Sequence, residues 1–182
     1  MNTPNKLTFI RVLLVPVFMW AFLRGFDIAA IVIFAVAALT DQLDGHLARK
    51  NNQVTTFGKL MDPIADKVLT IAALVCFVEA GADFVNSWVV MLVIARELIV
   101  TGIRLIALGE NQVIAASGCG KAKTVSQMAA IIAVMVDRIV PLRLGESQFL
   151  CLTFWLIALM VVLTIYSGVD YVVKNRRLIT FK

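Results

Sequence analysis

The fold is decided by the stretch IAAIVIFAVAALTDQLDGH, residues 28–46, in which a long apolar run ends in two aspartates. Such a run is typical of a helix that spans a bilayer, because a spanning helix needs roughly 20 mostly apolar residues. Acidic side chains at the end of the run are unusual, since a carboxylate at membrane depth costs roughly 2.5–3.5 kcal/mol. The stretch therefore predicts a membrane helix that carries a polar site.

Six apolar segments are found along the chain, at residues 7–24, 28–46, 62–80, 84–108, 124–142 and 149–173. All are predicted to be helices, because isolated strands cannot satisfy their backbone hydrogen bonds in lipid. Of the 182 residues, 60% are hydrophobic and 16% are charged, whereas soluble domains are about 45–50% apolar and about 25% charged. We therefore predict an all-α integral membrane protein with six transmembrane helices in a single domain, residues 1–182.

Positive charges favour one side of the predicted membrane. With six spans, both termini and the connections after the second and fourth spans share a side, which holds 14 of the 17 lysines and arginines. The exceptions are Arg24, Arg138 and Arg143. Because cytoplasmic loops are rich in positive charge, both termini are predicted to be cytoplasmic. The net charge of +5 suits anionic lipids or phosphorylated solutes, and nucleic acid is not an expected partner because no soluble basic domain is predicted.

Four aspartates lie at the edges of the second and third apolar segments: Asp41, Asp44, Asp62 and Asp66. At 100° per residue, each pair occupies one helix face. The first pair lies with Gly45, Ala48 and Arg49 within an arc of about 140°, and the second lies with Gly58 within an arc of about 80°. Small residues on the same faces would let a ligand approach the backbone closely. Oxygen-only ligands suit Mg²⁺ or Mn²⁺, and two such ions can clamp the attacking and leaving oxygens of a phosphoryl displacement.

Each aspartate also has an ordinary structural interpretation. Asp41 and Asp44 could cap a helix end or pair with the basic residues that follow them. Asp62 could be an N-cap before a proline at the first helical position, and Asp66 could pair with the lysine that follows it. His46, the sole histidine, is predicted to be a packing residue. Four such coincidences on two adjacent segments are less plausible than one metal site.

The spacing Asp41-x2-Asp44-Gly45-x2-Ala48-Arg49-x8-Gly58-x3-Asp62-x3-Asp66 resembles the signature of the CDP-alcohol phosphotransferases. The resemblance implies six helices that enclose a polar cavity open to the cytoplasm, and a homodimer. It implies that the first three aspartates bind divalent metal, and that Asp66 is both a ligand and the catalytic general base. The residues it implies for the cytidine diphosphate site are Asp44, Gly45, Ala48, Arg49 and Gly58.

The N-terminal segment adds two candidates for the same site. Asn5 and Thr8 would share much of one helix face with Arg11. They could form a polar lip of the nucleotide pocket, and are candidate CDP-binding residues on that interpretation. They could equally anchor and cap the first helix at the membrane surface.

The second half of the chain carries four candidates for binding an acceptor phosphate: Arg96, Arg104, Lys121 and Lys123. The lysines lie in the glycine-containing stretch 117–124, whose backbone N–H groups could cradle an anion. The alternatives are an internal ion pair in the fourth helix, where Glu97 and Arg104 are seven residues apart and nearly in line, and a flexible basic loop at 117–124.

The motifs Arg96-Glu97-x-Ile99-Val100-Thr101-Gly102-x-Arg104 and Gly120-Lys121-x-Lys123-Thr124-x2-Gln127-Met128 resemble those of the bacterial phosphatidylglycerophosphate synthase branch of this family. The resemblance implies CDP-diacylglycerol as donor, glycerol 3-phosphate as acceptor, and a location in a bacterial cytoplasmic membrane. The alternatives are the same chemistry with serine, inositol phosphate or a phospholipid as acceptor, and a divalent-cation transporter.

Overall fold

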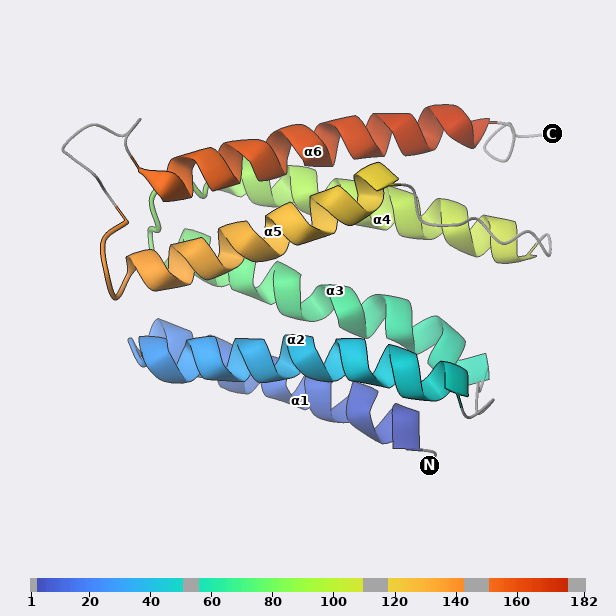
Figure 1. Ribbon diagram of the computed structural model, residues 1–182, viewed down its shortest axis with the longest axis horizontal. Coiled ribbons are helices and arrows are strands. Elements are labelled where there is room, and N and C mark those ends of the chain that lie inside the picture. Colours follow the sequence, from blue (N-terminus) through green and yellow to red (C-terminus); the bar gives the residue numbers. More distant parts are fainter. Residues whose placement is uncertain (1–2, 51–55, 110–117, 143–150, 177–182) are drawn as a thin grey trace. The chain divides into compact units, whose positions relative to one another are not determined.

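The computed structural model describes residues 3–50, 56–109, 118–142 and 151–176, and for residues 3–8, 41–50, 56–66 and 108 it describes the backbone alone. Within these ranges the chain forms six helices (Figure 1): α1 (Thr3–Leu23), α2 (Asp27–Lys50), α3 (Thr56–Glu79), α4 (Ser87–Gly109), α5 (Gly118–Asp137) and α6 (Leu152–Lys174). The prediction of an all-helical fold with six helices is confirmed.

Four helices extend at least four residues beyond the apolar segments that predicted them. α1 begins at Thr3, α2 continues to Lys50, α3 begins at Thr56, and α5 begins at Gly118. The predicted loop at 117–124 is therefore wrong from residue 118 onward, where the first turns of α5 lie, and Ser117 is outside the described residues. Helical hydrogen bonds do not require apolar side chains, so a helix can continue past the end of its apolar run.

Residues 1–80 form one compact unit, which contains α1, α2 and α3. α1 packs against both other helices, and α2 contacts α3. Its core is aromatic: the ring centre of Phe18 lies 5.7 Å from that of Phe34, and Phe22 lies 5.2 Å from Phe77. At Gly25 the backbone takes a φ of 80°, a conformation that favours glycine and that ends α1 just before α2 begins.

Residues 81–182 form the second compact unit, in which α6 packs against both α4 and α5. The buried residues of α6 recur every three or four positions and so form one stripe along the helix: Thr153, Ile157, Met160, Thr164, Ser167 and Tyr171. Half of this stripe is polar and small, which is unusual for the interface of an otherwise apolar helix. The stripe indicates that α6 supports polar partners on its neighbours.

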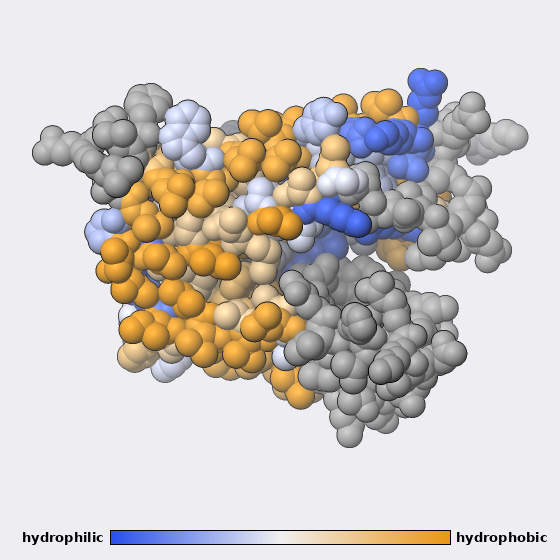
Figure 2. Space-filling model, in the orientation of Figure 1, coloured by the Kyte–Doolittle hydropathy of each residue, from blue (hydrophilic) through white to orange (hydrophobic). Residues whose placement is uncertain are grey.

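The surface of the described helices suits contact with lipid. Within the described residues, α5 and α6 are long and apolar enough to cross a membrane, whereas α4 carries Arg96, Glu97 and Arg104 within its length. Figure 2 shows mostly hydrophobic residues over the described surface, with hydrophilic residues gathered near the C-terminal end of α6. All three tryptophans are exposed and lie near helix ends, as at membrane interfaces: Trp20, Trp88 and Trp155.

Candidate active site

The four aspartates lie on two helices of the first unit, with Asp41 and Asp44 in α2 and Asp62 and Asp66 in α3. The backbone is helical across both pairs, so each pair shares a helix face as the spacing predicts. Their side chains are outside the described residues, and the metal site stays a prediction. The donor set itself, four carboxylates on two helices that contact each other, fits a hard divalent cation.

The helix bounds decide two of the alternative interpretations. α2 continues to Lys50, so Asp41 and Asp44 do not cap its end. α3 begins at Thr56, so Asp62 lies inside the helix and is not its N-cap. Both capping interpretations are wrong, and the possible ion pairs of these aspartates concern side chains outside the described residues.

The remaining predicted CDP-binding residues and His46 also lie on helical backbone whose side chains are outside the described residues: Asn5, Thr8, Gly45, Ala48, Arg49 and Gly58. Arg11, which shares a face of α1 with Asn5 and Thr8, is 3% exposed. This face of α1 is therefore covered by protein at Arg11.

A charged cluster joins the three helices of the second unit. The Arg96 Nη1 donates to Glu97 Oε1 at 3.0 Å, and the Lys123 Nζ of α5 donates to the same carboxylate oxygen and to Gln127 Oε1. The Arg96 Nη2 donates to Ser167 Oγ of α6 at 3.1 Å. Among the described residues, the cluster joins two basic side chains and one carboxylate in a largely buried site.

The cluster lies far inside α4 rather than at its end. Arg96 is the tenth residue of this 23-residue helix, about 14 Å from its beginning at 1.5 Å per residue. The orientation argument placed Arg96 on the cytoplasmic side, and that side stays a prediction. An ion pair of Glu97 is confirmed, but its partners are Arg96 and Lys123 and not Arg104, the residue seven positions further along α4.

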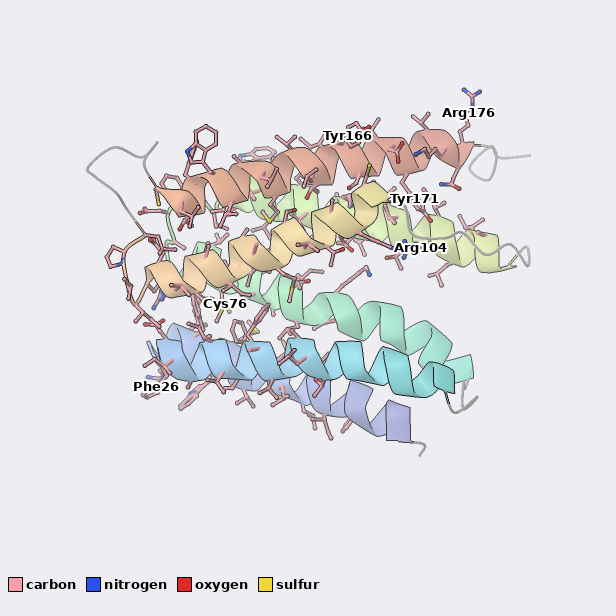
Figure 3. All side chains as sticks on the ribbon, in the orientation of Figure 1. Phe26, Cys76, Arg104, Tyr166, Tyr171 and Arg176 are labelled. Atoms are coloured by element: carbon pink, nitrogen blue, oxygen red, sulfur yellow. The ribbon has the colours of Figure 1, made fainter. Side chains whose placement is uncertain are left out.

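Arg104 has different surroundings on the same helix. Its Nε donates to Tyr171 Oη of α6 at 3.3 Å, and its guanidinium carbon lies 5.6 Å from the centre of the Tyr171 ring. Figure 3 shows these two side chains next to each other. No carboxylate among the described residues pairs with Arg104, and its two Nη groups have no hydrogen-bond partner there.

The two lysines of α5 also differ from each other. Lys123 is 1% exposed and belongs to the Glu97 cluster, whereas Lys121 is exposed. Of the four predicted acceptor-binding residues, the structure brings Arg96 and Lys123 together on Glu97. It leaves Arg104 and Lys121 without an ion pair among the described residues.

An open groove of about 370 Å³ runs between α4 and α6. Arg96 and Thr164 contribute polar atoms, and the other lining residues are apolar or glycine. Such a lining does not suit a diphosphate or a phosphorylated alcohol, because it offers few groups to replace their hydration. The groove is therefore not the polar cavity that the sequence predicts.

Sequence reasoning missed the contribution of α6. Ser167 contacts Arg96 and Tyr171 contacts Arg104, but neither residue stood out as a candidate. The available signal was the polar residues at spacings of three and four in an apolar helix, which mark one face.

Comparisons with known proteins show which family the chain belongs to. The family described as CDP-alcohol phosphatidyltransferase matches residues 1–166. A CDP-diacylglycerol–glycerol-3-phosphate 3-phosphatidyltransferase of Bacillus subtilis (strain 168) is 39% identical over 189 residues, covering 96% of this chain and 95% of the relative. Proteins with the same description from Haemophilus influenzae and Escherichia coli (strain K12) are both 43% identical, over 71% of this chain and 73% and 74% of their own lengths.

Proposed function

The chain belongs to the CDP-alcohol phosphatidyltransferase family, and from this premise we propose that it transfers a phosphatidyl group from CDP-diacylglycerol to glycerol 3-phosphate. The products are phosphatidylglycerol phosphate and CMP. The observation that carries the proposal is the 39% identity to a relative of that activity over 96% of this chain. An acceptor other than glycerol 3-phosphate would leave the reaction at the CDP-diacylglycerol phosphorus unchanged.

The donor site is proposed on α2 and α3. Asp41, Asp44, Asp62 and Asp66 would hold two divalent cations, Mg²⁺ or Mn²⁺, as the all-oxygen donor set favours. When bound, such ions neutralise the diphosphate and stabilise the charge that develops on the leaving CMP. Asn5, Thr8, Gly45, Ala48, Arg49 and Gly58, together with Asp44, would contact the cytidine diphosphate.

The reaction is proposed as a direct displacement. A hydroxyl oxygen of glycerol 3-phosphate attacks the phosphorus that carries the diacylglycerol, and a new P–O bond forms. The bond from this phosphorus to the oxygen of CMP breaks, and CMP leaves with the electron pair. The carboxylate of Asp66 accepts the hydroxyl proton as general base, and the Arg49 guanidinium stabilises charge on the departing phosphate.

The acceptor phosphate is proposed to bind among Arg96, Arg104, Lys121 and Lys123. Arg104 and Lys121 supply the main contacts, because neither charge is compensated by a carboxylate among the described residues. Arg96 and Lys123 both bind Glu97, so their N–H groups are less open to an acceptor phosphate. A phosphorylated acceptor suits this charge better than serine does.

The protein is a membrane protein with helical spans, and we propose that all six helices cross the membrane with both termini in the cytoplasm. The excess of positive charge on that side supports the orientation. The polar cavity would open to the cytoplasm, where glycerol 3-phosphate and CMP are soluble, while the acyl chains of the donor stay in lipid. A homodimer is proposed from the family resemblance alone.

The test is an acceptor panel with purified protein in mixed micelles. CDP-diacylglycerol labelled in the cytidine is incubated with Mg²⁺ or Mn²⁺ and with glycerol 3-phosphate, serine, inositol phosphate or phosphatidylglycerol. CMP release and the lipid product are then measured. We expect CMP release with glycerol 3-phosphate and a product of the mass of phosphatidylglycerol phosphate. Turnover with serine and none with glycerol 3-phosphate would contradict the proposed acceptor.

A further inference from the structure

One helix, α6, orients both arginines of α4. Ser167 accepts a hydrogen bond from Arg96 Nη2 at 3.1 Å, and Tyr171 accepts one from Arg104 Nε at 3.3 Å. Ser167 and Tyr171 are four residues apart on α6 and so lie on one face of it. The α6 face that packs on α4 is therefore a support for the two guanidinium groups.

At Gly168, α6 leaves room for the side chain of Arg96. A Cβ atom added at this position would lie 3.1 Å from Cγ of Arg96, closer than most such contacts. The glycine therefore allows the arginine stem to lie directly against the α6 backbone. With Ser167 beside it, this segment holds Arg96 toward Glu97.

Tyr171 is itself held in one place. It is 4% exposed and packs with Val100 and Ile103 of α4. The ring therefore cannot move away from α4 without opening this contact. Its hydroxyl and its ring face together define where the Arg104 guanidinium lies.

The contact to Tyr171 uses the Nε of Arg104 and places the guanidinium carbon over the face of the tyrosine ring. The two Nη groups, which form the fork that binds phosphate oxygens, have no hydrogen-bond partner among the described residues. An aspartate or glutamate in the place of Tyr171 would also orient the arginine, but its negative charge would offset that of the guanidinium. A tyrosine orients the guanidinium without placing a negative charge beside it.

We propose that Tyr171 is a positioning residue for acceptor recognition: it holds Arg104 so that its Nη groups bind the phosphate of the acceptor alcohol. This inference rests on the proposed function and adds a residue to it. An immobilised guanidinium loses less conformational entropy on binding than a free one. Tyr171 therefore contributes to the affinity for the phosphorylated acceptor and to its preference over an acceptor without phosphate.

The chain offers a matched control. Its two tyrosines both lie on α6, and Tyr166 is 58% exposed whereas Tyr171 is 4% exposed. Figure 3 labels both on α6, with Tyr171 beside Arg104. Tyr166→Phe and Tyr171→Phe remove the same atom from the same helix, and the second alone removes a hydrogen bond to an arginine.

The experiment compares the wild type, Tyr171→Phe, Tyr166→Phe, Arg104→Ala and the double variant Tyr171→Phe/Arg104→Ala in purified form. We expect Tyr171→Phe to raise KM for glycerol 3-phosphate about three- to tenfold with kcat and the KM for CDP-diacylglycerol within about twofold. Tyr166→Phe should match the wild type. The double variant should have the KM of Arg104→Ala, because the hydroxyl acts through that arginine.

Three outcomes would overturn the proposal. They are an unchanged acceptor KM in Tyr171→Phe, an unchanged acceptor KM in Arg104→Ala, and a Tyr171→Phe effect that persists at full size in the double variant. A purely structural role would lower thermal stability and shift the CDP-diacylglycerol KM as well, and that result also contradicts it. Failure of the proposed function is distinguishable, since the wild type would then show no turnover with glycerol 3-phosphate.

Discussion

Replacing Glu97 by glutamine tests the charged cluster of the second unit. The Glu97 carboxylate accepts hydrogen bonds from Arg96 and Lys123, and the Lys123 side chain is 1% exposed. Glutamine keeps the size of the side chain and removes its negative charge. The two cations then face a neutral amide in a site from which water is largely excluded.

The expected loss is large because the cluster is buried. Removing one partner of a buried ion pair costs about 3–5 kcal/mol, since the remaining charge stays desolvated. For a chain of this size, 1 kcal/mol corresponds to about 2–4 °C in Tm. We therefore expect Glu97→Gln to lower Tm by about 6–20 °C in detergent.

The assay can use the protein's own thiols. Cys76 and Cys151 are free and buried, one in each compact unit, so a thiol-reactive fluorophore reports unfolding as they become accessible. Lys174→Ala is the control. It breaks an ion pair with Asp170 in the same unit as Glu97, and the Lys174 side chain is 64% exposed. This control should melt with the wild type, since exposed pairs contribute little to stability.

A second variant separates charge from packing. Glu97→Gln/Lys123→Met removes the carboxylate together with one of the two basic groups that it binds. Its Tm should lie clearly above that of Glu97→Gln, because an apolar side chain of similar length replaces a buried ammonium that has lost the Glu97 carboxylate. The reasoning is refuted if Glu97→Gln melts with the wild type, or if the double variant melts no higher than the single one.

Three further results are expected. Asp66→Asn should abolish CMP release while CDP-diacylglycerol still binds, because the base and one of four proposed ligands are lost; near-normal turnover would exclude this base. Chelation of divalent cations should stop turnover, and Mg²⁺ or Mn²⁺ should restore it; turnover that survives exhaustive chelation contradicts the metal site. Gly168→Ala should cost about 1–3 kcal/mol in thermal unfolding, because its Cβ would lie 3.1 Å from Arg96 Cγ; a wild-type Tm would show that α6 adjusts freely.

The six helices were predictable because lipid imposes a simple rule on composition. A segment of roughly 20 apolar residues has one stable form in a bilayer, and each such segment proved to be a helix. The errors fall at polar ends, as at Lys50, Thr56 and Gly118. Hydropathy marks the part of a helix that suits lipid, whereas the end of a helix depends on backbone hydrogen bonds and caps.

The candidate site was predictable where its information is local. The two aspartate pairs follow from spacing on single helices, and the helical backbone at Asp41–Asp44 and Asp62–Asp66 supports their shared faces. The partners of the second unit are not local. Lys123 lies 26 residues from Glu97, and Ser167 lies 71 residues from Arg96. Such contacts depend on the register between helices, which no single segment encodes.

The two arginines of α4 show how position along a helix decides what an identical side chain can do. Arg96 lies near the middle of α4 and shares a carboxylate with Lys123, whereas Arg104 lies about 12 Å further along and contacts a neutral hydroxyl. The cost of an uncompensated charge falls from the centre of a bilayer toward its surface. With α4 proposed to cross the membrane, a partner carboxylate matters more for Arg96 than for Arg104. The arginine proposed to bind the anionic acceptor is then the one nearer the helix end, where a charge without a carboxylate partner costs less.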